Sequence, residues 1–134
     1  MIMKNTMNKI YKMNNPVNWF EIAKNDLERA KKFYSAVFKR EFQLIEMPDA
    51  KMYMFAGGPD LHGAIGALVS ASDNKPNPDG TIVYFECDDV AIESGRVEEA
   101  GGKLLFPKMS IGDFGFISQC IDTEGNRIGF HSHK

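Results

Sequence analysis

Four side chains of this sequence could hold a metal ion or move a proton. They are two carboxylates and two imidazoles in strand-like runs, Glu21, His62, Glu86 and His131. Carboxylates and imidazoles are the ligands that zinc and related metals take in proteins. Glu21 could also act as a catalytic general base, because a cavity beside the indole of Trp19 would raise its proton affinity. A hydrogen-bonded, purely structural Glu21 is an equally weighted alternative.

The composition limits the classes of function. A chain of 134 residues suffices for one domain with a real core, and a net charge of -2 leaves no concentrated basic face for nucleic acid. No apolar run approaches the ~20 residues that a bilayer span needs. Cys87 and Cys120 fit free thiols in a reducing compartment, although one disulfide between them stays open. We therefore expect a cytoplasmic protein without nucleic-acid or membrane partners.

The first ordered element is predicted to be a strand at about residues 17–23. Apolar and polar residues alternate there, which places Trp19 and Glu21 on one face and Phe20 and Ile22 on the other.

A helix follows this strand, because apolar residues recur at helical spacing in "NDLERAKKFYSAVF". Asn25 and Glu28 have the form of a capping box, and Asp26 can serve instead as the cap or as a partner of the helix dipole. Three strand-like runs come next, separated by Pro48 and by the Gly-Gly-Pro turn at 57–59.

The same order of elements then repeats. "TIVYFECDD" alternates like the first strand, "DVAIESGRVEEA" predicts a helix, and three more strand-like runs close the chain. Gly95 weakens this second helix by ~1 kcal/mol relative to alanine, and Gly101 with Gly102 ends it. Asp26 and Asp89 hold matching places before the two helices, 63 residues apart. The sequence therefore predicts an internal duplication of a βαβββ unit.

The domain limits follow from these elements. Residues 1–15, rich in Met, Asn and Lys, predict a disordered tail, and residues 16–134 form a single domain. Module one covers about 16–69, a polar linker with two prolines covers 70–80, and module two covers about 81–133.

The order of elements and three segments resemble the vicinal oxygen chelate superfamily, which includes glyoxalase I, bleomycin-resistance proteins and extradiol dioxygenases. The segments are "DLERAKKFYSAVF", "EEAGGKLLFPK" and "DTEGNRIGFH", and the likeness covers roughly Pro16 to His133. The resemblance implies an α+β fold in which two tandem βαβββ modules form a curved mixed sheet, or cup, with the helices on the outside and the ligand within. It also implies a homodimer.

The resemblance further implies one metal ligand on the first and last strand of each module. Carried onto this sequence, these positions fall at Trp19, Gly66, Ile82 and Gly129. None of these side chains can coordinate a metal. The sequence therefore resembles a glyoxalase-like member that lacks the metal ligands, and we expect no metal or other cofactor.

Nearby carboxylates and imidazoles are displaced from those positions by unequal distances along their strands. A two-residue step moves a side chain by ~6.7 Å, whereas ligand atoms must meet a common centre within ~0.2 Å of ideal distances. A pair drawn from His62, Glu86 and His131 could still recruit a metal weakly, but a four-ligand site is not expected.

The cup is expected to enclose a small organic ligand, aromatic in our leading interpretation. Trp19, Tyr84 and Phe114 would surround it, and Glu21 and His131 would make polar contacts.

Two strand glycines in matching places, Gly66 and Gly129, would make room for this ligand, because glycine within a strand often marks a close approach to the backbone. They could equally make room for Trp19, which would then plug the cavity.

Three hypotheses of function follow. The leading one is a metal-independent small-molecule-binding protein of the glyoxalase/bleomycin-resistance type. The second is an isomerase or lyase in which Glu21 moves a proton next to a carbonyl. The third is an interaction module whose cavity is filled by its own side chains, with Trp19 fully buried.

Overall fold

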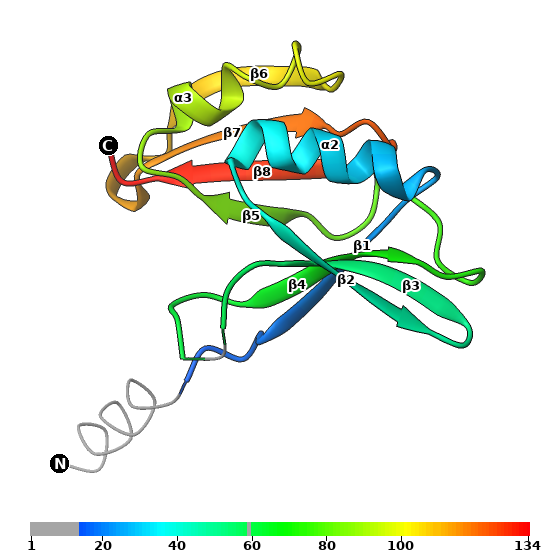
Figure 1. The fold of residues 1–134 in the computed structure, drawn as a ribbon. Helices are drawn as coiled ribbons and strands as arrows, with labels where there is room; N and C mark the ends of the chain where they lie inside the picture. Colours follow the sequence, from blue (N-terminus) through cyan, green and yellow to red (C-terminus); the bar gives the residue numbers. More distant parts are fainter. Residues whose placement is uncertain (1–13, 59) are drawn as a thin grey trace, which may run out of the picture.

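The computed structural model describes residues 14–58 and 60–134, which form two βαβββ modules of an α+β fold (Figure 1). The predicted tail at 1–15 lies outside the described residues except for its last two. No helix in the described ranges is long and apolar enough to cross a membrane. Cys87 and Cys120 are buried free thiols.

Module one contains one helix and a four-stranded sheet, called sheet A here, in the order β1-β4-β3-β2. Strands β1 and β4 are parallel, and the other neighbours are antiparallel. The elements are β1 (Trp19–Ala23), α2 (Leu27–Phe38), β2 (Phe42–Met47), β3 (Ala50–Phe55) and β4 (Ile65–Ser70).

Module two repeats this arrangement as sheet B, in the order β5-β8-β7-β6, with β5 and β8 parallel. Its edge strand β6 contains Pro107 and two shifts of register against β7. The elements are β5 (Val83–Glu86), α3 (Val90–Ser94), β6 (Lys103–Ser110), the 3-10 turn η1 (Gly112–Phe114), β7 (Phe116–Ile121) and β8 (Arg127–Ser132).

The second helix is shorter than the sequence predicts. Regular α-helix ends at Ser94, and hydrogen-bonded turns continue to Gly101. The break coincides with Gly95, whose low helix propensity the short segment cannot offset. Val90 and Val97 are nevertheless both fully buried.

The start of α2 settles the two capping alternatives. Asp26 is the N-cap, and its carboxylate accepts a hydrogen bond from the Arg29 backbone N–H at 3.0 Å. The capping box of Asn25 and Glu28 does not form, because the Glu28 carboxylate instead accepts a hydrogen bond from the Tyr53 hydroxyl.

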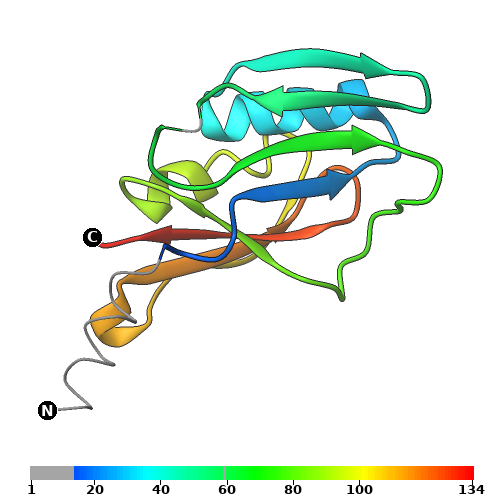
Figure 2. The ribbon, with the colours of Figure 1, turned by 90° about the horizontal axis from the view of Figure 1, so that it is seen from below.

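The two sheets share one hydrophobic core that surrounds α2. Figure 1 shows the strands of sheet B behind α2, and Figure 2, seen from below, shows the strands of sheet A in front of the same helix. The rings of Phe20 on β1 and Phe85 on β5 meet at a centroid distance of 6.0 Å where the two sheets adjoin. The core side chains include Ile22, Tyr34, Leu68, Ile128 and Phe130. Each sheet therefore turns one face to this core and an outer face away from it.

The turn between β7 and β8 fastens module two to module one through Glu124, which is 3% exposed. Its carboxylate accepts the backbone N–H groups of Asn25 at 2.8 Å and Asp26 at 2.6 Å, and it pairs with the Arg29 guanidinium at 2.8 Å. Burial alone would raise the pKa of Glu124, but Arg29 and the backbone donors outweigh burial and lower this pKa to about 2.

Two further residues of the same turn reach module one. The buried hydroxyl of Tyr34 donates to the Asp122 carboxylate at 2.6 Å, and burial together with that carboxylate raises the pKa of Tyr34 well above its ordinary value. The Asn126 amide donates to the carbonyl of Ala23 at 2.7 Å. The "DTEGN" segment is thus the main polar joint between the modules.

Candidate functional site

The outer face of sheet A carries an exposed aromatic side chain beside a carboxylate. Trp19 is 39% exposed, and its indole N–H donates to the exposed Glu21 carboxylate at 3.1 Å. Beside this pair on the same face lies a small buried apolar cluster of Met52, Ala67 and Val69. Trp19 is therefore not the fully buried plug of the third hypothesis within a single chain.

The outer face of sheet B carries a second aromatic side chain, Tyr84, which is 43% exposed. Tyr84 on β5 pairs with Gly129 on β8, which pairs with Gln119 on β7. The Gln119 amide donates to the Tyr84 hydroxyl at 2.6 Å. The phenol ring therefore lies across β8, directly over Gly129.

His131 lies one step further along the same face and holds the β6–β7 connection. Its Nε2 is 2.6 Å from the carbonyl oxygen of Phe114, so this nitrogen carries the proton when the ring is neutral. The Phe114 side chain itself is 77% exposed, at the rim of sheet B. His62 reaches Glu86 at 3.9 Å between two exposed side chains.

The two strand glycines do not hold equivalent places, contrary to our expectation. A side chain at Gly66 would point into the core, where its Cβ would lie 2.3 Å from the Phe20 ring, whereas one at Gly129 would point outward into the Tyr84 ring. The reason is strand register, because Phe20 pairs with Gly66 and shares its core-facing side. The outer-face residues of β4 are instead Ile65 and Ala67.

This correction leaves the chemistry of the expected ligand positions unchanged, because neither an isoleucine nor an alanine side chain can coordinate a metal. Among residues 14–58 and 60–134, no three His, Cys, Asp or Glu side chains are grouped so that they could hold a metal ion.

The structure keeps the two sets of predicted site residues on separate surfaces. Trp19 and Glu21 lie on the outer face of sheet A, whereas Tyr84, Gly129 and His131 lie on the outer face of sheet B. In the part of the chain that the structure describes, no hydrogen bond or ring contact joins the two sets. The shared core separates them.

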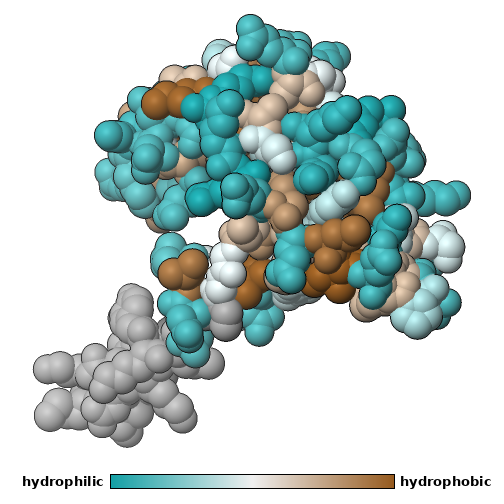
Figure 3. All heavy atoms as spheres, in the orientation of Figure 1, coloured by the Kyte–Doolittle hydropathy of each residue, from teal (hydrophilic) through white to brown (hydrophobic). Residues whose placement is uncertain are grey.

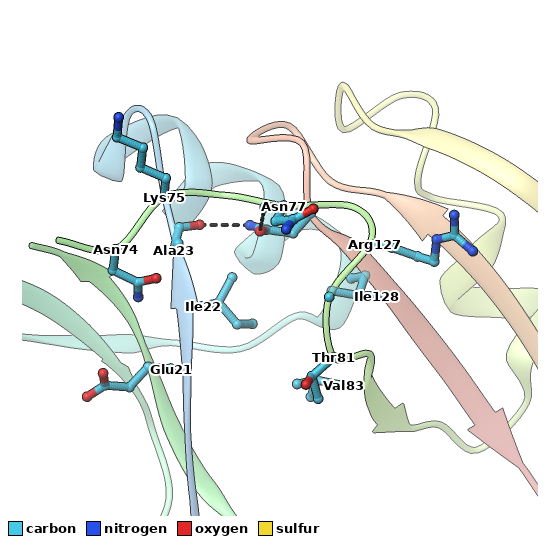
Figure 4. A pocket seen from close by; sticks show the side chains of 12 residues that line it. Glu21, Ile22, Ala23, Asn74, Lys75, Asn77, Thr81, Val83, Arg127 and Ile128 are labelled. Atoms are coloured by element: carbon cyan, nitrogen blue, oxygen red, sulfur yellow. Dashed lines mark hydrogen bonds between the residues drawn. The ribbon is translucent and has the colours of Figure 1, made fainter.

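An open hollow of about 190 Å³ lies between the modules, and Glu21 of sheet A and Arg127 of sheet B are among the residues that line it. Its walls include Ile22, Val83 and Ile128. Figure 4 shows Ile22 directed into the hollow, with Glu21 and Arg127 directed away from it on opposite sides. This view confirms that the outer faces of β1 and β8 diverge.

Two polar residues of the sheet-B face, Gln119 and Arg127, were missed by the sequence interpretation. Arg127 precedes Gly129 by two residues and could have been assigned by alternation. Gln119 required the pairing of β7 with β8, which the sequence does not reveal.

Residues 17–130 match the Glyoxalase/Bleomycin resistance protein/Dioxygenase superfamily, and the chain belongs to this family. A glyoxylase-like domain-containing protein of Didymella fabae is 34% identical over 117 residues, covering 82% of this chain and 88% of that protein. A putative glyoxylase, CFP32, of Mycobacterium tuberculosis is 29% identical over 123 residues, covering 89% of this chain. The chain spans about half, 46%, of the length of this mycobacterial relative.

Solved structures share the fold at lower identity. Glyoxalase I from Zea mays superposes with a TM-score of 0.69 at 19% identity, covering 86% of this chain and 45% of the maize chain. A glyoxalase/bleomycin resistance protein from Albidiferax ferrireducens superposes with a TM-score of 0.69 at 15% identity, covering 90% of this chain and 100% of that chain. These likenesses concern the fold alone.

Proposed function

We propose that this glyoxalase-like protein binds a small organic ligand, without a metal, in a cup completed by a second copy of the chain. The outer face of sheet A in one copy would oppose the outer face of sheet B in the other. The observation that carries this proposal is the presence of one exposed aromatic side chain on each outer face, Trp19 and Tyr84, on surfaces that diverge within one chain.

Exposed apolar surface supports the involvement of a second copy. Beside Trp19 and Tyr84, the structure exposes Met109 on the outer face of sheet B and Phe114 at its rim. Figure 3 shows further hydrophobic residues reaching the surface below α2. Grouped exposed apolar side chains of this kind mark interaction or ligand surfaces in soluble proteins. A dimer would enclose Trp19 and Glu21 together with the Tyr84 and His131 side chains.

The proposal is tested by oligomeric state and by ligand binding after treatment with a chelator. We expect a dimer by light scattering and binding of aromatic probes that the chelator leaves unchanged. Trp19 is the single tryptophan of the chain, so its fluorescence reports directly on the cup. A monomer, or stoichiometric zinc, nickel or iron whose removal abolishes binding, would contradict the proposal.

A second candidate function is that of an isomerase or lyase with Glu21 as the general base. One carboxylate oxygen of Glu21 is oriented by the indole N–H of Trp19, which leaves the other free to accept a proton. Glu21→Gln should abolish turnover in such an enzyme but merely weaken binding in a non-catalytic protein. Glu46→Gln, another exposed glutamate on sheet A, is the matched control.

A further inference from the structure

The outer face of sheet B is organised in rows that run across its strands. Backbone pairing places Lys103, Ile121 and Arg127 in one row, on β6, β7 and β8. The next row contains Gln119 and Gly129 with Tyr84 over them. Rows on one face are ~6.7 Å apart, since two residues separate them along each strand. A cationic row therefore borders the aromatic one.

Tyr84 is held as a flat platform rather than as a free side chain. Gly129 beneath it has no side chain, and a Cβ there would lie 2.3 Å from the ring, so the ring rests directly on the backbone of β8. The hydroxyl is fixed by Gln119 at 2.6 Å. One side of the ring is thereby covered by the sheet, and the other is presented to a ligand, with little rotational freedom to lose on stacking.

Arg127, in the neighbouring row, has a donor without an acceptor. Its Nε atom is buried, and among the described residues no group accepts its hydrogen bond. Neither Arg127 nor Lys103 forms an ion pair within the described part of the chain. Figure 4 shows the guanidinium directed away from the hollow between the modules. The terminal nitrogens of the Arg127 guanidinium are not buried, and among the described residues no group accepts their hydrogen bonds either, so an external acceptor there would stabilise the charged group.

We propose that the sheet-B half of the cup binds a planar aromatic acid, with the ring stacked on Tyr84 and the carboxylate at Arg127 and Lys103. This inference rests on the proposed function, because it names the ligand class of the same outer face. A guanidinium matches the two oxygens of a carboxylate in a fixed geometry. The row spacing favours a ring and a carboxylate joined by a short linker, as in an arylpropionate.

The test uses three probes of similar size with the full-length protein and isothermal titration calorimetry. They are 3-phenylpropionate, its uncharged amide, and 3-cyclohexylpropionate, which keeps the charge but has no aromatic ring. We expect the aromatic acid to bind about 10-fold or more tightly than its amide, as for a charge-assisted hydrogen bond. We also expect it to bind several-fold more tightly than the cyclohexyl acid.

Two variants assign these preferences to residues. Arg127→Met keeps an unbranched apolar stem and should remove the preference for acid over amide. Tyr84→Leu should remove the preference for the phenyl over the cyclohexyl acid while keeping the preference for charge. Arg40→Met removes an exposed arginine outside both sheets and should change neither preference. Thermal unfolding of each variant reports whether it is folded.

If Arg127→Met does not fold, Lys103→Met and the salt dependence of the native protein decide the question. Added salt should weaken binding of the acid and leave the amide unaffected. Equal binding of acid and amide to the native protein would overturn this inference and leave the proposed function standing. Failure of all three probes to bind would also overturn this inference, whereas the proposed function is tested separately by the oligomeric state and by binding after treatment with a chelator.

Discussion

The two modules repeat one order of elements but differ where the last two strands of each are connected. In module two the connection "DTEGN" is built around the buried Glu124 and is bonded to α2 and to the end of β1. In module one the described residues of the equivalent connection, 56–58 and 60–64, are largely exposed, and Leu61 faces solvent. The two modules therefore share one order of elements, whereas among the described residues only the module-two connection forms a polar joint between them.

The outer faces differ in the same way. Sheet A carries the exposed Trp19 and Glu21 beside a buried apolar cluster that includes Met52 and Val69. Sheet B presents the polar and cationic set of Gln119, Arg127 and His131. A cup made from one face of each kind would hold the apolar side of a ligand on one wall and fix its polar groups on the other.

The largest effect is expected from breaking the Glu124 joint of module two. Glu124→Ala leaves two backbone N–H groups and Arg29 without their acceptor, and should lower the free energy of unfolding by about 3 kcal/mol. Urea denaturation measures this change. Leu61→Ser, in the equivalent connection of module one, should change the free energy of unfolding by no more than about 0.5 kcal/mol. Similar losses in the two variants would show that the connections are equivalent after all.

The same joint should give the protein a defined loss of stability in acid. The pKa of Glu124 is about 2 in the folded protein, below its ordinary value of 4.5, so the unfolded chain binds more protons between these limits. The stabilisation, on the order of 3 kcal/mol, is fully present above about pH 4.5 and is lost as pH falls toward 2.

Denaturation curves between these pH values test this dependence on a matched pair. Glu124→Gln cannot titrate at this position, so its stability should fall less steeply with acid than that of the native protein. If the free energy of unfolding fell equally with pH in the two proteins, titration of Glu124 would not be the cause of the acid sensitivity.

The two glycines provide a sharper comparison between the modules. Gly66→Ala would push against the Phe20 ring inside the core and should destabilise the protein by about 1–3 kcal/mol. In Gly129→Ala the Tyr84 ring can swing into solvent, so the cost should stay within about 1 kcal/mol. The second variant should nevertheless lose the Tyr84–Gln119 hydrogen bond, which is visible as a shift of the Gln119 side-chain amide signals in NMR spectra. Equal destabilisation by both substitutions would contradict their placement on opposite faces.

The smallest effect concerns a buried donor on the core face of module two. The Ser118 hydroxyl is fully buried, and within the described ranges it has no hydrogen-bond partner. Unlike Arg127 on the outer face, it lies where no ligand can reach it. Ser118→Ala should therefore leave the stability unchanged or raise it by up to about 1 kcal/mol. A loss of more than that in thermal unfolding would reveal a hydrogen bond at this position.

Much of the fold could be predicted because alternation and helical spacing are local properties of the sequence. The faces of β1, the buried side of α2 and the order of both modules follow directly from such patterns. The length of α3 could not, because helix propensity at Gly95 competes with packing of Val97, and the sequence does not show which prevails.

The site was less accessible to sequence reasoning. Counting a fixed offset between the modules misplaced Gly66 by one residue, and in a strand one residue reverses the face. The roles of Gln119 and Arg127 depend on which strands are neighbours, and that is a tertiary property. The separation of the two outer faces depends on the angle between the sheets, which no local pattern encodes.

Pro107 on the edge strand β6 has a consequence for how copies of the chain can meet. Proline offers no backbone N–H, and the two register shifts of β6 interrupt the row of free carbonyl and amide groups along that border. A strand from another chain could not form a regular set of backbone hydrogen bonds with β6, which disfavours edge-to-edge association along this strand. A dimer of the kind proposed above would therefore form between sheet faces and not across this border.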